Sequence, residues 1–293
     1  MPFLRTPLAG LAAALALAGA GAPAAIAAPP GKVEPPRRIV SLNLCTDQLV
    51  LALADRSQIA GLTRNATNAE MSAEAARARG LRILGSSAEE ILAIAPDLVV
   101  GAPTGGDLMH ILARRHYRLL HVTATERLED IFAAIRQTAA AIGHPARGEA
   151  LIARMRRNLA RIPRTGGGKV AAYYQRRGYL TGNGTLVDDL MRRLGLVNLA
   201  GRLGKPVLSQ VGLEEMVAAR PDYIIVESAT DRITDQGTEM LHHPALGNIP
   251  RISIPQAWTV CGGPAYVDAA RSIAARIARH ERRKAIPSEP DRP

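Results

Sequence analysis

Ser87–Val100 reads SAEEILAIAPDLVV, and Gly212–Ile225 reads GLEEMVAARPDYII. Each copy has a residue that can start a helix, two glutamates, an apolar run with helical spacing, Pro-Asp and an apolar β-type run. Two copies of one helix–strand unit, far apart in a chain, indicate two similar lobes. Because strands and helices alternate around both copies, the sequence predicts an α/β protein with mainly parallel sheets.

The stretches around the two copies complete the predicted lobes. Strands are expected at 38–43, 59–63, 98–101, 119–122, 170–174, 223–227 and 251–254. Helical patterns cover 127–142 and 145–162, and the second is long enough to bridge the lobes. The predicted organisation is an N-terminal lobe at 38–126, a helical linker at 127–163, a C-terminal lobe at 168–284 and a disordered, Pro-rich tail at 285–293.

The N-terminus has the pattern of an export signal. Leu8–Ala20 is an apolar run broken only by glycines, and Ala25-Ile26-Ala27 is a small-residue cleavage pattern. We therefore expect residues 1–27 to be a secretory signal peptide and the mature protein to be soluble. Export places Cys45 and Cys261 in an oxidising compartment, where a disulfide and two free thiols near a pocket are both possible.

The positive charge of the chain does not indicate a nucleic-acid partner. The formal net charge is +11, with 37 Lys and Arg residues, nearly all of them arginine. The arginines are spread along the predicted helices and form no single basic tract, and the sequence has no nucleic-acid-binding motif.

The paired glutamates of the two copies have different expected duties. Ser87 and Glu90 have the spacing of a capping box, in which each side chain satisfies a backbone N–H at the helix start. Glu89 does not fit that box and should face solvent. Glu214 occupies the matching position of the second copy, so neither Glu89 nor Glu214 is needed for capping.

The opening strand RIVSL at 38–42, the two Glu-x-x-x-x-x-x-Pro-Asp segments and the long helix between the lobes resemble the periplasmic substrate-binding proteins of ABC importers for iron chelates, haem and cobalamin. The resemblance extends from Arg38 to about Arg283. It implies two Rossmann-like lobes joined by a long rigid helix, with a ligand cleft between them. It also implies a periplasmic monomer without a cofactor or a catalytic activity, which delivers its chelate to a permease dimer with ATPase subunits. In such proteins each lobe presents a glutamate to one permease subunit, and the matching residues here are Glu89 and Glu214.

Candidate ligand contacts come from loops at the carboxyl ends of the predicted strands, where parallel α/β sheets bind ligands. These loops are 43–47, 63–67, 103–106, 175–183, 227–231 and 256–263. Tyrosine and arginine can stack on flat ligands and bind carboxylates. Because neighbouring strand residues alternate in direction, one of Tyr173 and Tyr174 should be a core residue. The predicted ligand contacts are Cys45, Thr46, Asp47, Arg64, Thr104, Tyr174, Gln175, Arg176, Arg177, Tyr179 and Trp258.

Two other function classes compete with chelate binding. An exported carrier of free zinc or manganese would need several histidine and carboxylate ligands, and the predicted cleft loops contain no histidine. An exported enzyme using the cleft would need a nucleophile elbow, a metal set or a phosphate loop, and the sequence contains none of these motifs. The sequence leaves open whether the chelate is a siderophore, haem or cobalamin, although the basic loop residues favour an anionic one.

Overall fold

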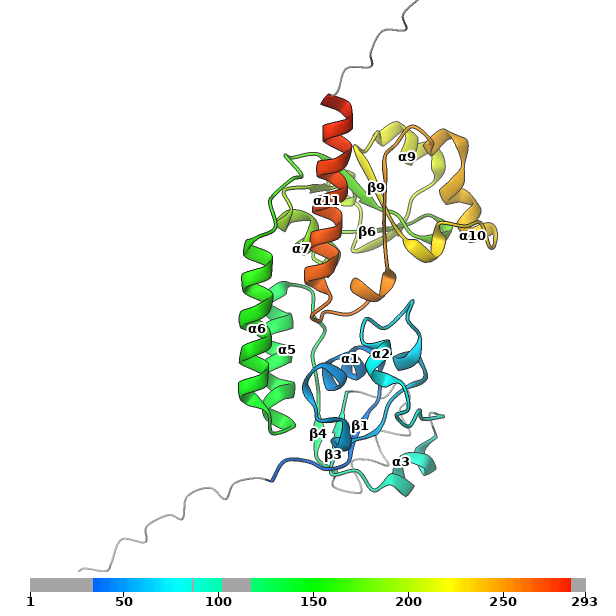
Figure 1. Cartoon of the computed structure of the whole chain (residues 1–293). Coiled ribbons are helices and arrows are strands. Elements are labelled where there is room, and N and C mark those ends of the chain that lie inside the picture. The colour runs from blue at the N-terminus through cyan, green and yellow to red at the C-terminus, as the bar shows by residue number, and fades with distance from the viewer. Residues whose placement is uncertain (1–33, 86, 102–116, 286–293) are drawn as a thin grey trace, which may run out of the picture. The chain divides into compact units, whose positions relative to one another are not determined.

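The computed structural model describes residues 34–85, 87–101 and 117–285 (Figure 1). The predicted signal peptide at 1–27, the candidate contact Thr104 and most of the predicted tail lie outside these residues.

The first lobe is built on a parallel sheet of four strands in the order β2-β1-β3-β4. The strands are β1 (Ile39–Ser41), β2 (Ile59–Gly61), β3 (Leu98–Val100) and β4 (Leu119–Leu120). Its helices are α1 (Leu44–Leu53), α2 (Ala75–Ala78) and α3 (Ala88–Ile94). β1 and β3 are buried along their whole length, as expected for central strands covered on both faces.

The second lobe repeats this plan with a parallel sheet in the order β10-β9-β5-β7. Its strands are β5 (Val170–Tyr173), β7 (Val197–Asn198), β9 (Tyr223–Glu227) and β10 (Arg251–Ile254). Its helices are α7 (Leu186–Arg193), α8 (Leu199–Arg202), α9 (Leu213–Ala219) and α10 (Gln236–Glu239). The lobe also has an antiparallel pair, β6 (Tyr179–Thr181) with β8 (Leu208–Gln210), and β6 lies within the segment 175–183 that the sequence indicated as loop.

Three long helices accompany the two sheets (Figure 1). α5 (Leu128–Ala141) and α6 (Pro145–Ala160) run side by side, and α6 also contacts α11 (Tyr266–Ala285). A Cβ atom at Gly148 of α6 would lie 2.6 Å from the Cβ atom of Ala139, so glycine permits the close crossing of α5 and α6. The apolar faces of these helices join both lobes in one buried hydrophobic cluster.

The repeated Pro-Asp pair ties the strand of each copy to the first strand of its lobe. The Asp97 carboxylate accepts hydrogen bonds from the backbone N–H groups of Arg37 and Arg38, at 2.7 and 2.8 Å. In the second lobe the Asp222 carboxylate accepts one from the N–H of Val170, at 2.7 Å. Each copy of the repeated sequence therefore supplies an aspartate that hydrogen-bonds to the backbone at the first strand of its lobe.

The start of α1 differs from the prediction of a loop at 44–47. Asn43 caps a helix that begins at Leu44, and its side chain accepts a hydrogen bond from the N–H of Thr46 while the Thr46 hydroxyl lies near the N–H of Asn43. Cys45, Thr46 and Asp47 therefore lie on the first helical turn.

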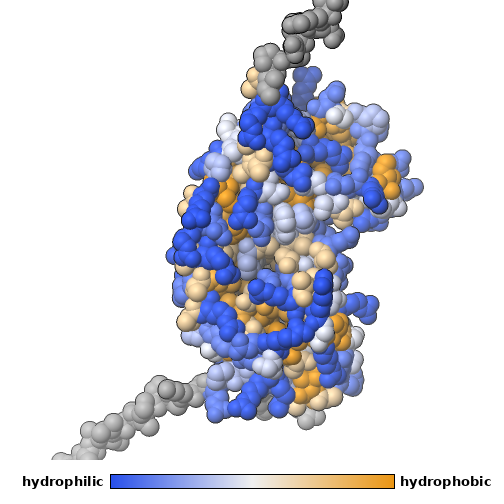
Figure 2. Space-filling view, in the orientation of Figure 1, coloured by the Kyte–Doolittle hydropathy of each residue, from blue (hydrophilic) through white to orange (hydrophobic). Residues whose placement is uncertain are grey.

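The exposed surface mixes polar and apolar residues, as Figure 2 shows for one face. Hydrophilic residues gather over the last turn of α11, which carries Arg282, Arg283 and Lys284. None of the helices within the described residues is long and apolar enough to cross a membrane.

Candidate ligand-binding cleft

A cavity of about 370 Å³ is lined by residues of both lobes. The first lobe contributes the start of α1, and the segment between β4 and α5 forms one wall. The second lobe contributes the start of α7 and the loop before α11. The lining residues are Asn43, Cys45, Thr46, Leu49, Val122, Thr123, Ala124, Thr125, Leu186, Thr259, Val260, Cys261 and Gly262.

A second cavity, of about 280 Å³, adjoins the first and lies in the second lobe. The two share Leu186, Thr259 and Val260. The other lining residues of the second cavity are Tyr173, Gln175, Thr181, Thr185, Val187, Glu227 and Gln256. We call the two adjoining cavities the inter-lobe cleft. Its lining consists mostly of short hydroxyl, amide and apolar side chains, which suits the orientation of a ligand by a few polar contacts.

A disulfide bond crosses the inter-lobe cleft. Cys45, on the first turn of α1, is bonded to Cys261 in the loop before α11, with their Cα atoms 5.2 Å apart. The structure therefore decides between the two states that the sequence left open for these cysteines. Cys45 lines the cavity as half of a covalent link between the lobes, to a cysteine that is 216 residues away in sequence.

Tyr173 and Glu227 form a buried polar pair in the second cavity. Tyr173 is the last residue of β5, and Glu227 is the last residue of the neighbouring strand β9. Both line the second cavity, and they are 2% and 7% exposed, respectively. The Tyr173 hydroxyl lies 2.9 Å from the hydroxyl of Thr259. Burial raises the pKa of the Glu227 carboxyl, although nearby Arg176 and a hydrogen bond from Tyr173 oppose the shift. Burial and the Glu227 charge likewise raise the pKa of the Tyr173 phenol.

The loop that carries Cys261 packs tightly against the wall formed by Thr125. A Cβ atom at Gly262 would overlap the Thr125 side chain and lie 2.9 Å from Cγ1 of Ile131. We expect Gly262→Ala to lower the free energy of unfolding by about 1–3 kcal/mol, because a methyl group must force this contact apart. Chemical denaturation measures the effect.

Gly263→Ala is the matched control, because no heavy atom lies within 4 Å of a Cβ atom built at Gly263. Equal midpoints for the two variants would contradict the tight packing of Gly262.

Two candidate contacts on α1 have structural roles. Asp47 is fully buried, and its carboxylate accepts hydrogen bonds from the backbone N–H of Thr63, at 3.2 Å, and from its hydroxyl. The prediction that Asp47 contacts a ligand is therefore wrong. Thr46 does line the cleft, but its hydroxyl lies 2.8 Å from that of Ser41 and donates to the carbonyl of Asn43, at 3.0 Å.

In the second lobe, the tyrosine prediction selected the wrong neighbour. Tyr174 is fully buried in the core, where its hydroxyl donates to the carbonyl of Val211 at 2.8 Å. The alternation expected along β5 therefore places Tyr174 in the core and Tyr173 at the cleft. Burial raises the pKa of Tyr174 to about 12. Gln175 lines the cleft, and its contact with a ligand stays a prediction.

The remaining candidates lie outside the lining of the cleft. Arg64, Arg177 and Tyr179 are exposed, and the exposed Arg176 is paired with Asp235. Trp258 is partly buried and packs against the hydrophobic core, between the lining residues Gln256 and Thr259. Their contacts with a ligand stay predictions.

Residue-level prediction missed Tyr173, Glu227, Gln256 and Thr259. Each lies at the carboxyl end of a strand of the second sheet or just beyond it. The loops at 227–231 and 256–263 were predicted to face the cleft, so the signal for three of these residues was available. What the sequence lacked was the direction of each side chain.

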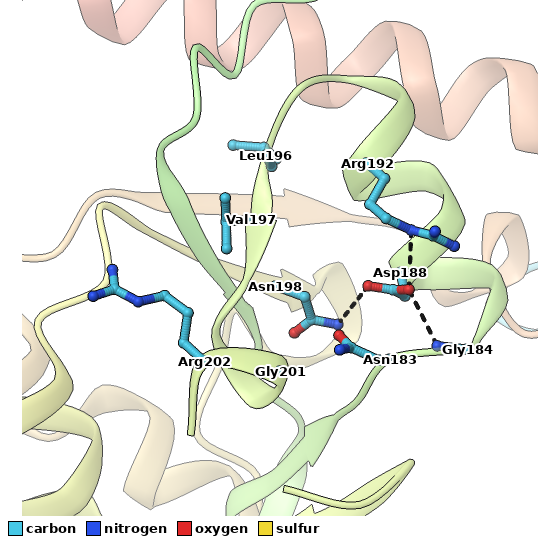
Figure 3. Close-up of a pocket in the computed structure, with 9 residues that line it drawn as sticks. All are labelled: Asn183, Gly184, Asp188, Arg192, Leu196, Val197, Asn198, Gly201 and Arg202. Atoms are coloured by element: carbon cyan, nitrogen blue, oxygen red, sulfur yellow. Dashed lines mark hydrogen bonds and ion pairs between the residues drawn. The ribbon is translucent and has the colours of Figure 1, made fainter. Parts of the chain in front are cut away.

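A further cavity, of about 520 Å³, belongs to the second lobe alone (Figure 3). Its buried Asp188 accepts hydrogen bonds from the side-chain amide of Asn198, at 3.2 Å, and from the N–H of Gly184, at 3.1 Å, and pairs with Arg192 at 3.1 Å. Asp188 therefore holds α7 to β7, and we do not place the ligand here because the cavity does not involve the first lobe.

In both lobes, the second glutamate of the repeated pair forms an ion pair, and the first forms none with the described residues. Glu90 forms an ion pair with Arg82 at 3.5 Å, and Glu215 forms one with Lys205 at 2.7 Å. Glu89 and Glu214 are exposed and form no ion pair with any other described residue.

The helix start favours the charged form of Glu89. Ser87 accepts a hydrogen bond from the N–H of Glu90, as the capping box requires, but the Glu90 carboxylate bonds to the N–H of Gly85. Hydrogen bonding with its own N–H and with the Ser87 side chain lowers the pKa of the Glu89 carboxyl. Glu89 is therefore ionised at neutral pH.

Within 34–85, 87–101 and 117–285, no group of three or more His, Cys, Asp or Glu side chains is placed to hold a metal ion.

Two parallel α/β sheets, a linking pair of helices and a cleft lined from both lobes define a two-lobed binding protein. The chain matches the periplasmic binding protein family over residues 39–252, and it belongs to that family. It is 26% identical over 202 residues to the vitamin B12-binding protein of Pectobacterium carotovorum subsp. carotovorum (strain PC1), which covers 66% of this chain and 71% of that protein.

Two solved structures share the fold. A periplasmic heme-binding protein from Roseiflexus sp. RS-1 has a TM-score of 0.68 and 24% identity, covering 83% of this chain and 98% of its own. The periplasmic vitamin B12-binding protein of Vibrio cholerae has a TM-score of 0.62 and 15% identity, covering 84% of this chain and 98% of its own. The predicted two-lobed α/β architecture is confirmed.

Proposed function

We propose that this chain is the periplasmic solute-binding component of an ABC importer, which captures a metal chelate between its lobes and delivers it to the inner-membrane permease. The family is one of periplasmic binding proteins. A curated relative binds vitamin B12, and proteins with the same fold are described as binding heme or vitamin B12. The predicted signal peptide at 1–27 fits a periplasmic location.

The observation that carries this proposal is the composition of the inter-lobe cleft. A ligand that contacts Thr46 and Thr125 on one side and Gln175 and Gln256 on the other would bridge both lobes. Binding would then favour the closed arrangement of the lobes, because only that arrangement makes both sets of contacts. The permease would then recognise the closed arrangement and, with it, the loaded protein.

The exposed glutamates support the second half of the proposal. Glu89 and Glu214 occupy matching positions at the N-termini of α3 and α9, one in each lobe. Two similar acidic sites on two similar lobes suit a dimeric permease that presents one basic site per subunit. Such exposed charges mainly set orientation and association rate.

Titration of the purified mature protein with cyanocobalamin, haemin and a ferric siderophore tests the ligand class. Trp258 is the only tryptophan of the chain, and its neighbours Gln256 and Thr259 line the cleft. We expect saturable quenching of its fluorescence and a rise in Tm with at least one chelate. If none of the three causes quenching or a thermal shift, the chelate-binding proposal fails.

The same protein preparation tests the rival function of a free-metal carrier. We expect metal analysis of the purified protein to find no stoichiometric zinc or manganese after dialysis. A tightly bound divalent ion in the absence of a chelator would favour the metal carrier. Turnover of a bound chelate, detected as a chemically altered product, would favour the exported enzyme.

A further inference from the structure

The charges around the inter-lobe cleft are unusual for a protein that would bind a carboxylated chelate. Among the described lining residues there is no arginine, lysine or histidine, and Glu227 is the only carboxylate. Haem and many siderophores carry carboxylates, which proteins bind with arginine or lysine. The described lining offers no such cation.

The one basic side chain that lowers the pKa of Glu227 is already paired with another carboxylate. Arg176 lies close enough to lower the pKa of Glu227, but its guanidinium is paired with Asp235 and its side chain is 51% exposed. The basic loop residues that favoured an anionic chelate in the sequence therefore do not contribute a free cation to the described lining.

The Glu227 carboxylate can accept more hydrogen bonds than the protein supplies. It is 7% exposed and forms no ion pair with the described residues, and Tyr173 is the one side chain whose hydrogen bonding lowers its pKa. A carboxylate offers about four acceptor positions. A buried acceptor that faces a cavity is therefore placed to receive N–H donors from a ligand.

We propose that the cleft selects an uncharged chelate whose rim carries amide N–H donors, and that Glu227 is the acceptor that determines this specificity. The inference rests on the proposed function and narrows its ligand class. A ligand amide would donate to Glu227 and accept from the hydroxyl and amide groups of Thr259, Gln175 or Gln256. A ligand carboxylate at the same place would meet the Glu227 carboxylate in a partly desolvated site whose described lining offers no compensating cation.

A pair of corrin chelates with the same ring and metal provides the test. Dicyanocobinamide carries side-chain amides, whereas dicyanocobyrinic acid carries carboxylates at those positions. At neutral pH we expect the full-length mature protein to bind the amide chelate at least about tenfold more tightly, because like-charge contacts are strongly unfavourable in a buried site. Isothermal titration measures both affinities.

Glu227→Gln keeps the shape of the side chain and removes its charge. We expect this variant to bind the amide chelate more weakly and the carboxylate chelate more tightly, so that the ratio of affinities narrows by about tenfold. Glu239→Gln is the matched control, because Glu239 is exposed in the same lobe and does not line the cleft. It should leave the ratio unchanged. Thermal unfolding confirms that both variants are folded.

The outcomes separate this inference from the proposed function. Equal affinity of the wild-type protein for the two corrins, or an unchanged ratio in a folded Glu227→Gln, would overturn the role of Glu227 while leaving chelate binding intact. Tight binding of haemin with no binding of either corrin would overturn the ligand class. If Glu227→Gln does not fold, Gln256→Glu tests the same inference. A second carboxylate in the cleft should increase the preference for the amide corrin over the carboxylate corrin, and an unchanged preference would overturn the inference. No binding of any chelate would reject the proposed function itself.

Discussion

Uptake of the chelate is expected to stop when Glu89 and Glu214 are both replaced by alanine, while the affinity of the purified protein for the chelate stays the same. Both carboxylates are exposed at the start of a helix, and neither forms an ion pair with another described residue. Their removal should lower stability only by the helix-dipole contribution, about 0.3–1 kcal/mol each. Transport of labelled chelate into cells and titration of the purified variant measure the two effects separately.

Glu90→Ala with Glu215→Ala is the matched control for this pair. These neighbours have the same charge and lie one residue further along, but they are engaged with Arg82 and Lys205. Losing these ion pairs should cost about 0.2–1 kcal/mol each and leave transport largely intact. Wild-type uptake by the Glu89→Ala, Glu214→Ala protein would show that the permease docks elsewhere. Single variants should give intermediate uptake, because each lobe would keep or lose one contact.

The architecture was predictable because each repeated segment contains the local signals that end its helix and begin its strand. The strand of the second copy, at 223–227, has the predicted bounds, and Pro96 and Pro221 follow the ends of the two repeated helices. Just before each proline the chain takes a left-handed conformation, at Ala95 and Arg220, so even this local feature is duplicated. Local pattern and tertiary pairing agree here, and such agreement makes a fold readable from one sequence.

The ligand-facing side chains were harder to predict than the loops that carry them. Alternation along β5 shows that Tyr173 and Tyr174 face opposite sides of the sheet, but it does not show which side is the cleft. That choice depends on what covers each face. Tyr174 packs with the core that contains Met216, whereas Tyr173 is covered by the loop before α11. This loop is 86 residues away in sequence from Tyr173, so no local pattern reports the contact.

The role of Asp47 was hidden for a related reason. A polar residue after a strand indicated a binding loop, but α1, capped by Asn43, begins at Leu44, which is four residues earlier than expected from the apolar pattern. The helix turns Asp47 towards Thr63, and both donors of that residue satisfy its carboxylate. Capping chemistry was visible in the sequence at Asn43 and Thr46, and weighing it above hydrophobicity would have moved the helix start.

Removal of the inter-lobe disulfide has the second large expected effect. The bond joins residues 216 positions apart, so it greatly restricts the unfolded chain. The chain-entropy relation gives a stabilisation of about 5 kcal/mol for a loop of this length. Cys45→Ala with Cys261→Ala should therefore lower the denaturation midpoint strongly. Chemical denaturation of the oxidised wild-type protein and of the variant measures the difference.

The same variant should also release its ligand faster. Cys45 and Cys261 both line the cleft, so their bond holds its two walls together where a chelate would enter or leave. Without it the lobes can separate further, and dissociation of the chelate should be faster in stopped-flow displacement. A reducing agent should reproduce both effects in the wild-type protein, because Cys45 is exposed, and should change nothing in the variant. Identical unfolding of the oxidised wild-type protein and the variant would show that non-covalent contacts alone hold the cleft together.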